Sequence, residues 1–106
     1  MLDLRVVWPK GEWEPLNTEI RTDEELVARW IEPNPHKPRP AEAWVLPRHV
    51  SVWAVIRQLE LDAWKVKCVA EGFELPVEAV EAAIRYYRRH RADVDARIIR
   101  NRASFD

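Results

Sequence analysis

A dense run of arginines near the carboxyl end is the part of the sequence best suited to binding chemistry. Between positions 85 and 102 there are seven arginines but only two acidic residues, Asp93 and Asp95, which leaves a local excess of five positive charges. Clustered guanidinium groups suit contacts with the phosphates of nucleic acid, and such contacts make binding depend on salt concentration. The segment therefore predicts a phosphate-binding surface.

Six basic residues are the predicted contacts to a DNA backbone: Arg57, Lys65, Lys67, Arg85, Arg88 and Arg89. Three glutamates, Glu74, Glu78 and Glu81, occupy the start of the helix that would read bases, and their carboxylates would repel phosphate. A structural use of the arginines is open as well, because basic side chains stabilise the carboxyl end of a helix and Glu81 is spaced for a surface ion pair with Arg85.

Residues able to do catalysis or to bind metal are few and scattered. The three histidines, His36, His49 and His90, lie far apart in the sequence, and the one cysteine, Cys68, has no second ligand at metal-binding spacing. Ser51 follows His49 by two positions, but a serine before an apolar helix is typical of a helix cap. We therefore predict that the chain is not an enzyme and uses neither metal nor cofactor.

Composition indicates a folded protein with one domain's length of chain. The 106 residues are 47% hydrophobic and 33% charged, and the formal net charge of −1 differs from the strongly basic balance of a non-specific nucleic-acid binder. A single cysteine, no signal-like amino terminus and no long apolar run predict a cytoplasmic protein without a membrane span.

Two features predict a homodimer. The six tryptophans are many for this length, and tryptophan serves subunit interfaces as well as cores. Residues spaced alternately three and four apart form an a/d register from 77 to 101, which Arg91 and Asn101 interrupt. Either one long helix continues this register to a partner, or the chain breaks between 90 and 93 and Asp93 caps a further helix; the break is favoured.

The first half predicts short elements followed by a connector. Alternating apolar residues from 2 to 8 indicate a strand, and Thr22 with Glu25 forms a capping-box pattern for a helix that should end before Pro33. The prolines between 33 and 40 exclude helix and central strand, so we expect an extended connector. Its uses are a stiff linker or, less favoured, a ligand for a partner's aromatic groove.

The second half predicts three helices. Ser51 and Asp62 are placed to cap the first two, and Gly72 to end the second. Pro76 suits the first turn of the third helix. The inward positions of that third helix are predicted to be Val77, Val80, Ala83, Ile84 and Tyr87. A short helix, a tight turn and a longer helix, preceded by a packing helix, is the helix-turn-helix arrangement.

The helix-turn-helix half resembles a known family of small bacterial proteins, the domain of unknown function 433 family. The matching residues are 50–56, 66–70, 75–90 and 93–95, and they include the paired Tyr86 and Tyr87 and the following His90. The resemblance covers residues 45–102, and the lead into the first helix departs from the family's pattern. The family is similar to VapB-type antitoxins, which implies DNA binding with autoregulation and capture of a toxin partner.

Together these observations predict a mainly α protein, a helix-turn-helix bundle of three to four helices with a small N-terminal β element. Residues 1–44 are predicted to form an extension that packs on the bundle or exchanges with a second subunit, and residues 45–106 the helix-turn-helix domain. The predicted function is an antitoxin-like DNA-binding regulator of a toxin-antitoxin system. The alternative is a protein-interaction adaptor that keeps the helix-turn-helix fold without binding DNA.

Overall fold

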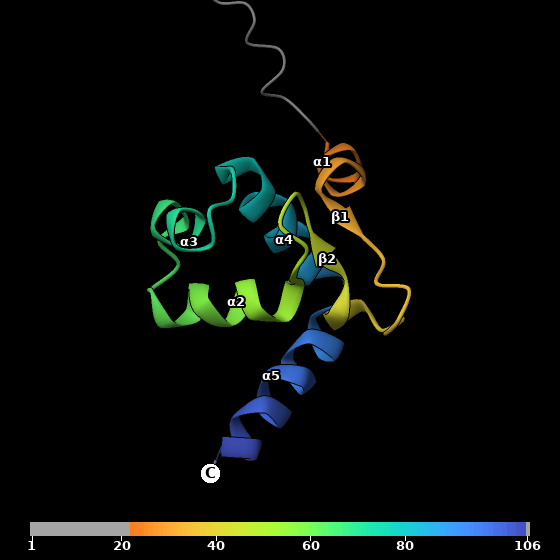
Figure 1. Ribbon diagram of the computed structural model, residues 1–106, viewed down its shortest axis with the longest axis vertical. Coiled ribbons are helices and arrows are strands. Elements are labelled where there is room, and N and C mark those ends of the chain that lie inside the picture. The colour runs from red at the N-terminus through yellow and green to blue at the C-terminus, as the bar shows by residue number, and fades with distance from the viewer. Residues whose placement is uncertain (1–21, 106) are drawn as a thin grey trace, which may run out of the picture.

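The computed structural model describes residues 22–105, a mainly α-helical fold with a small antiparallel sheet (Figure 1). In chain order the elements are α1 (Asp23–Trp30), β1 (Ile31–Glu32), the 3-10 helix η2 (Pro40–Glu42), β2 (Trp44–Val45), β3 (Val50–Ser51), α2 (Val52–Leu61), α3 (Val66–Phe73), α4 (Val77–Arg89) and α5 (Arg91–Phe105). The predicted fold class, mainly α with a small β element, is confirmed. The strand predicted between 2 and 8 lies outside the described residues.

Helix α1 begins as its capping-box pattern predicts. The Thr22 hydroxyl accepts the Glu25 N–H at 3.1 Å, and the Glu25 carboxylate accepts the Thr22 N–H at 3.0 Å. The helix ends at Trp30, before Pro33, and its apolar Leu26 is buried. Local chemistry therefore fixes the start of this element, whereas its end coincides with the start of strand β1 at Ile31.

The chain next forms a three-stranded sheet in the order β1-β2-β3. Ile31 lies opposite Val45, and Val45 opposite Val50, in antiparallel register. Residues 33–39 lie outside helix and strand, as predicted, but Pro40 begins the 3-10 helix η2, contrary to the prediction for 33–40, and the segment turns instead of staying extended. The buried Asn34 makes that turn, because its side-chain oxygen accepts the His36 N–H at 2.9 Å.

The core is built around α4. Helices α1, α2 and α3 all pack against it, and strands β1 and β2 contact it as well. Most of its inward residues are small or β-branched, so neighbouring helices approach closely, and Tyr87 is the large exception. The buried set on α4 is Ala79, Val80, Ala82, Ala83 and Tyr87. Val77, predicted to face inward, is instead 39% exposed because it lies in the first turn, outside this packed stretch. Ile84 is half-buried at the edge of the core.

The junction between α2 and α3 differs from its prediction. Asp62 ends α2 instead of capping α3, because the chain bends back through Ala63 and Trp64, whose φ angles are 55° and 60°. The bend is closed by the Trp64 N–H, which donates to the Leu59 carbonyl at 2.7 Å. Helix α3 therefore begins at Val66, four residues after the predicted cap.

Two other predicted helix signals act differently. Gly72 lies inside α3, and Glu74 takes the left-handed position beyond it with φ 58°, held by the Leu75 N–H bond to Ala70 O at 2.8 Å. This arrangement buries Leu75. Ser51 does precede α2, but its side chain makes no capping bond within the described residues, and the first helical N–H, that of Val52, donates to Ala43 O.

Helices α4 and α5 are separate, as the favoured alternative predicts. The break is at His90, where φ is −130°, and α5 begins at Arg91. Asp93 is consequently inside the first turn of α5 and is not its cap. Val94 and Ile98 bury the first part of α5 against α2 and η2, whereas its carboxyl end extends away from the body (Figure 1).

Candidate binding surface

Two of the six predicted DNA contacts are engaged within the fold. Arg85 Nε lies 2.6 Å from Asp23 Oδ1, and Arg89 Nη2 lies 3.6 Å from Glu24 Oε2. Arg85 also donates to the carbonyl of Glu81 at 3.4 Å, so the side-chain pair expected between these two residues is replaced by a link to α1. These arginines attach α1 to α4. Because carboxylates of α1 already offset their charge, they are less suited to bind phosphates.

The other four predicted contacts are exposed: Arg57 on α2, Lys65 and Lys67 at the start of α3, and Arg88 on α4. Within the described residues none of them forms an ion pair with a carboxylate. The six therefore do not make one uniform basic surface. The fold divides them into a paired set facing α1 and an unpaired set facing solvent.

An open groove of about 360 Å³ lies beside Arg88, lined by Trp64, Ile84, Tyr87, Arg88 and Arg91. The ring centroids of Trp64 and Tyr87 are 6.4 Å apart, and Arg91 lies over the Tyr87 ring at 5.4 Å. Arg91 Nε also lies 3.4 Å from the Tyr87 hydroxyl. The groove thus joins the α2–α3 turn, α4 and α5 in an apolar surface edged by two guanidinium groups.

Tyr87 forms the inner wall of this groove. The sequence places Tyr87 in the core, and it is buried, with its hydroxyl donating to Asp95 Oδ1 at 2.8 Å. Burial raises the pKa of the hydroxyl, and the bond to Asp95 acts in the same direction, so it remains a protonated donor. The aromatic face, and not the hydroxyl, is therefore what this residue offers to a ligand.

Trp64 and Arg91 line the groove but are not among the site residues predicted from the sequence. Trp64 is 44% exposed, although a tryptophan ordinarily gains much from burial. The left-handed backbone at Ala63 and Trp64 directs it outward from the turn. One signal in the sequence could have indicated that Trp64 is exposed: it follows a helix end and is outside the apolar stripes of both neighbouring helices. A left-handed turn is usually recognised in a sequence by glycine or asparagine, and this turn contains neither.

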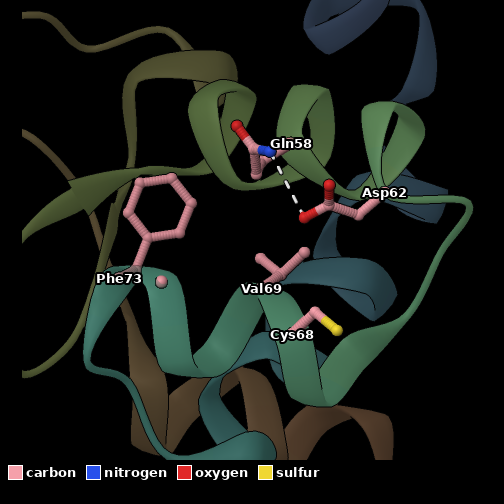
Figure 2. A pocket seen from close by; sticks show the side chains of 6 residues that line it. Gln58, Asp62, Cys68, Val69 and Phe73 are labelled. Atoms are coloured by element: carbon pink, nitrogen blue, oxygen red, sulfur yellow. Dashed lines mark hydrogen bonds between the residues drawn. The ribbon is translucent and has the colours of Figure 1, made fainter.

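A smaller pocket of about 180 Å³ lies between α2 and α3 (Figure 2). Gln58 donates to Asp62 Oδ2 at 3.3 Å across its rim, and Cys68, Val69 and Phe73 face it from α3. Its lining includes no histidine, lysine or arginine that could activate the Cys68 thiol. No group of three potential metal ligands comes together anywhere in residues 22–105.

Away from both pockets, charged groups attach α5 to η2. Glu42 Oε2 accepts the Arg97 Nε–H at 2.8 Å, and Arg97 lies over the Trp53 ring at 4.2 Å. Asp93 accepts the Ala41 N–H at 2.9 Å and pairs with Arg39. Each carboxylate is largely buried and has an arginine partner, so this contact is structural.

The environment of Asp93 shifts its titration. Partial burial pushes its pKa up, but the hydrogen bonds from the Ala41 N–H and the Arg39 guanidinium outweigh that effect. The pKa of Asp93 therefore lies below its ordinary value. The carboxylate stays ionised at neutral pH and keeps α5 attached to η2.

Comparisons of the chain with protein-family models, curated proteins and solved structures find no match. The resemblance to the domain of unknown function 433 family stays a prediction. Within residues 22–105 every helix is too short or too polar to span a bilayer.

Proposed function

We propose that the chain is a non-catalytic, cytoplasmic protein-binding module on a helix-turn-helix scaffold. The observation that supports this is the use of α4, the second helix of the motif, as the central core helix. A DNA-reading helix must expose a full face to enter the major groove. Here α1, α2 and α3 cover α4, and its arginines Arg85 and Arg89 contact α1.

The surface that α4 leaves open supports the same proposal. It is the groove around Trp64 and Tyr87, which combines aromatic rings with the guanidinium groups of Arg88 and Arg91. Tryptophan, tyrosine and arginine are the residues that contribute most to protein interfaces when a partner excludes water from them. A protein partner is thus the ligand class that this composition suits best.

The second candidate is the antitoxin-like DNA-binding regulator that also holds a toxin. The exposed and unpaired Arg57, Lys65 and Lys67 favour it, as does the family resemblance. In that case the phosphate contacts would come from α2 and the start of α3, and a homodimer would double them. Homodimerisation is part of this proposal, and a monomer mass from light scattering at micromolar concentration would count against it.

A mobility-shift assay on sheared DNA at low and at moderate salt separates the two candidates. The test variant is Lys65→Ala with Lys67→Ala, and the matched control is Arg88→Ala, one exposed charge away from that helix end. Absence of binding even at low salt supports the protein-binding module. Salt-sensitive binding that the lysine variant loses and the control keeps would instead favour the regulator.

A further inference from the structure

The geometry points to an acidic-apolar protein segment as the occupant of the groove lined by Trp64, Ile84, Tyr87, Arg88 and Arg91. Such a segment has a large apolar side chain flanked by carboxylates. This inference rests on the proposed function, because it names the partner chemistry of the same groove.

The floor of the groove fits an apolar side chain. Ile84 is half-buried, and the Trp64 and Tyr87 rings stand beside it with an angle of 34° between their planes. Its volume of about 360 Å³ is in the size range of small ligand pockets, which accommodates one large side chain with adjoining backbone. An apolar group placed there would cover aromatic surface that water now contacts.

The edges of the groove fit carboxylates. Arg88 and Arg91 are its two charged residues, and no acidic residue lines it. Arg91 is already positioned by the Tyr87 ring and hydroxyl, so little side-chain freedom remains to be lost on binding. A guanidinium group binds a carboxylate through two parallel hydrogen bonds, which gives direction as well as strength.

The backbone of the α2–α3 turn supports a binding role for Trp64. Two consecutive residues, Ala63 and Trp64, hold left-handed angles that are unfavourable for residues other than glycine. The result is a tryptophan displayed at the surface. Unfavourable backbone that displays a large apolar side chain is typical of recognition sites.

A protein fits this groove better than a single-stranded nucleic acid. Binding a nucleic-acid strand requires a basic path that follows successive phosphates, together with flat rings for successive bases. Only two cations line this groove, and its floor includes the aliphatic Ile84.

Isothermal titration calorimetry on the full chain tests the inference with two synthetic peptides. One has a central Phe-Leu pair between glutamates, and the other has lysines in place of the glutamates. We expect the acidic peptide to bind at least about tenfold more tightly than the basic one, with affinity falling as salt rises.

Three variants locate the binding. Trp64→Ala and Arg88→Glu should each weaken the acidic peptide by about tenfold, which corresponds to about 1.4 kcal/mol. Arg57→Glu makes the same charge change on an exposed residue outside the groove and should alter affinity by less than about twofold. Circular dichroism checks that each variant is folded.

Absence of peptide binding, equal binding of both peptides, or unchanged affinity in Trp64→Ala would overturn the inference. Tighter binding of an oligothymidine strand than of the acidic peptide would overturn it too, in favour of nucleic acid. Salt-sensitive binding of duplex DNA through Lys65 and Lys67 counts against the proposed function alone. If the chain binds neither DNA nor the acidic peptide, the result counts against the inferred occupant of the groove and leaves the proposed function standing.

Discussion

Arginine has opposite uses on the two sides of the junction between α4 and α5. Towards α1 and η2, Arg85 and Arg97 pair with Asp23 and Glu42, which precede them by 62 and 55 positions. Towards the α2–α3 turn, Arg88 lies beside aromatic rings and is exposed. A local excess of positive charge in the sequence therefore defines no binding surface by itself, because the fold can supply carboxylates from far along the chain.

The largest expected effect comes from breaking the paired side at Glu42. Its carboxylate is 11% exposed and Arg97 22%, so Glu42→Ala leaves a largely buried guanidinium group without its partner. We expect the free energy of unfolding to fall by about 3 kcal/mol. Urea unfolding followed by circular dichroism measures this change.

The matched control for Glu42 is the exposed pair of Arg48 and Glu74. Both of its side chains are more than half exposed, so Glu74→Ala should change the free energy of unfolding by less than about 1 kcal/mol. Equal losses in the two variants would show that burial of the Glu42 pair has no special role.

Asp93 gives the next largest effect, and it depends on pH. Asp93→Asn keeps the shape of the side chain but removes the charge that Arg39 and the Ala41 N–H stabilise, so we expect a loss of about 2 kcal/mol at neutral pH. Because the folded pKa lies below the ordinary value of 3.8, this stabilisation is present above that value and is lost as the pH falls through the folded pKa.

The pH dependence distinguishes a charge effect from a simple packing defect. The difference between the wild type and Asp93→Asn should shrink as urea unfolding is repeated at pH values that fall through the lowered pKa of Asp93, where the wild-type carboxylate becomes protonated. Asp23→Asn serves as the control, because the Asp23 carboxylate also pairs with an arginine but is half exposed. A difference that stays constant with pH would exclude the ionised form of Asp93 as the source of stability.

The same contrast explains what the sequence can predict. The capping box at Thr22, the break at His90 and the inward position of Tyr87 depend on residues within a few positions, and all three are confirmed. The contact between α1 and α4 and the pairing of Asp93 with Arg39 join distant segments. Local spacing carries no information about these contacts, so Asp93 was wrongly predicted to be a cap.

The candidate site was only partly within reach of the sequence for the same reason. Arg88 was among the predicted binding residues, and it does line the groove. Trp64 was not, because its position depends on a left-handed turn formed without glycine. Asp62 and Gly72 carried the usual helix-end signals, yet tertiary packing moved the boundaries of α3 away from both of them.

The left-handed backbone of the α2–α3 turn, which displays Trp64 at the groove, can be tested by substitution at Ala63. Ala63→Gly replaces a residue at φ 55° with one that adopts this angle freely, at the expense of a more flexible unfolded chain. We expect a net gain of about 0.5 to 1 kcal/mol in the free energy of unfolding. Thermal unfolding measures it, and Ala54→Gly, inside α2, should have the opposite sign because glycine weakens a helix.

The smallest expected effect is that of Arg88→Ala, which tests the unpaired side directly. Arg88 is exposed and forms no ion pair within the described residues, so its removal should change the free energy of unfolding by less than about 0.5 kcal/mol.

Arg85→Ala is the matched variant one turn earlier on α4, and it breaks the contact with Asp23 and with α1. It should cost about 1 kcal/mol, because its partner is half exposed. Chemical denaturation of both variants in one buffer gives the comparison, and a larger loss at Arg88 than at Arg85 would mean that the groove arginine stabilises the fold and is not held free for a partner.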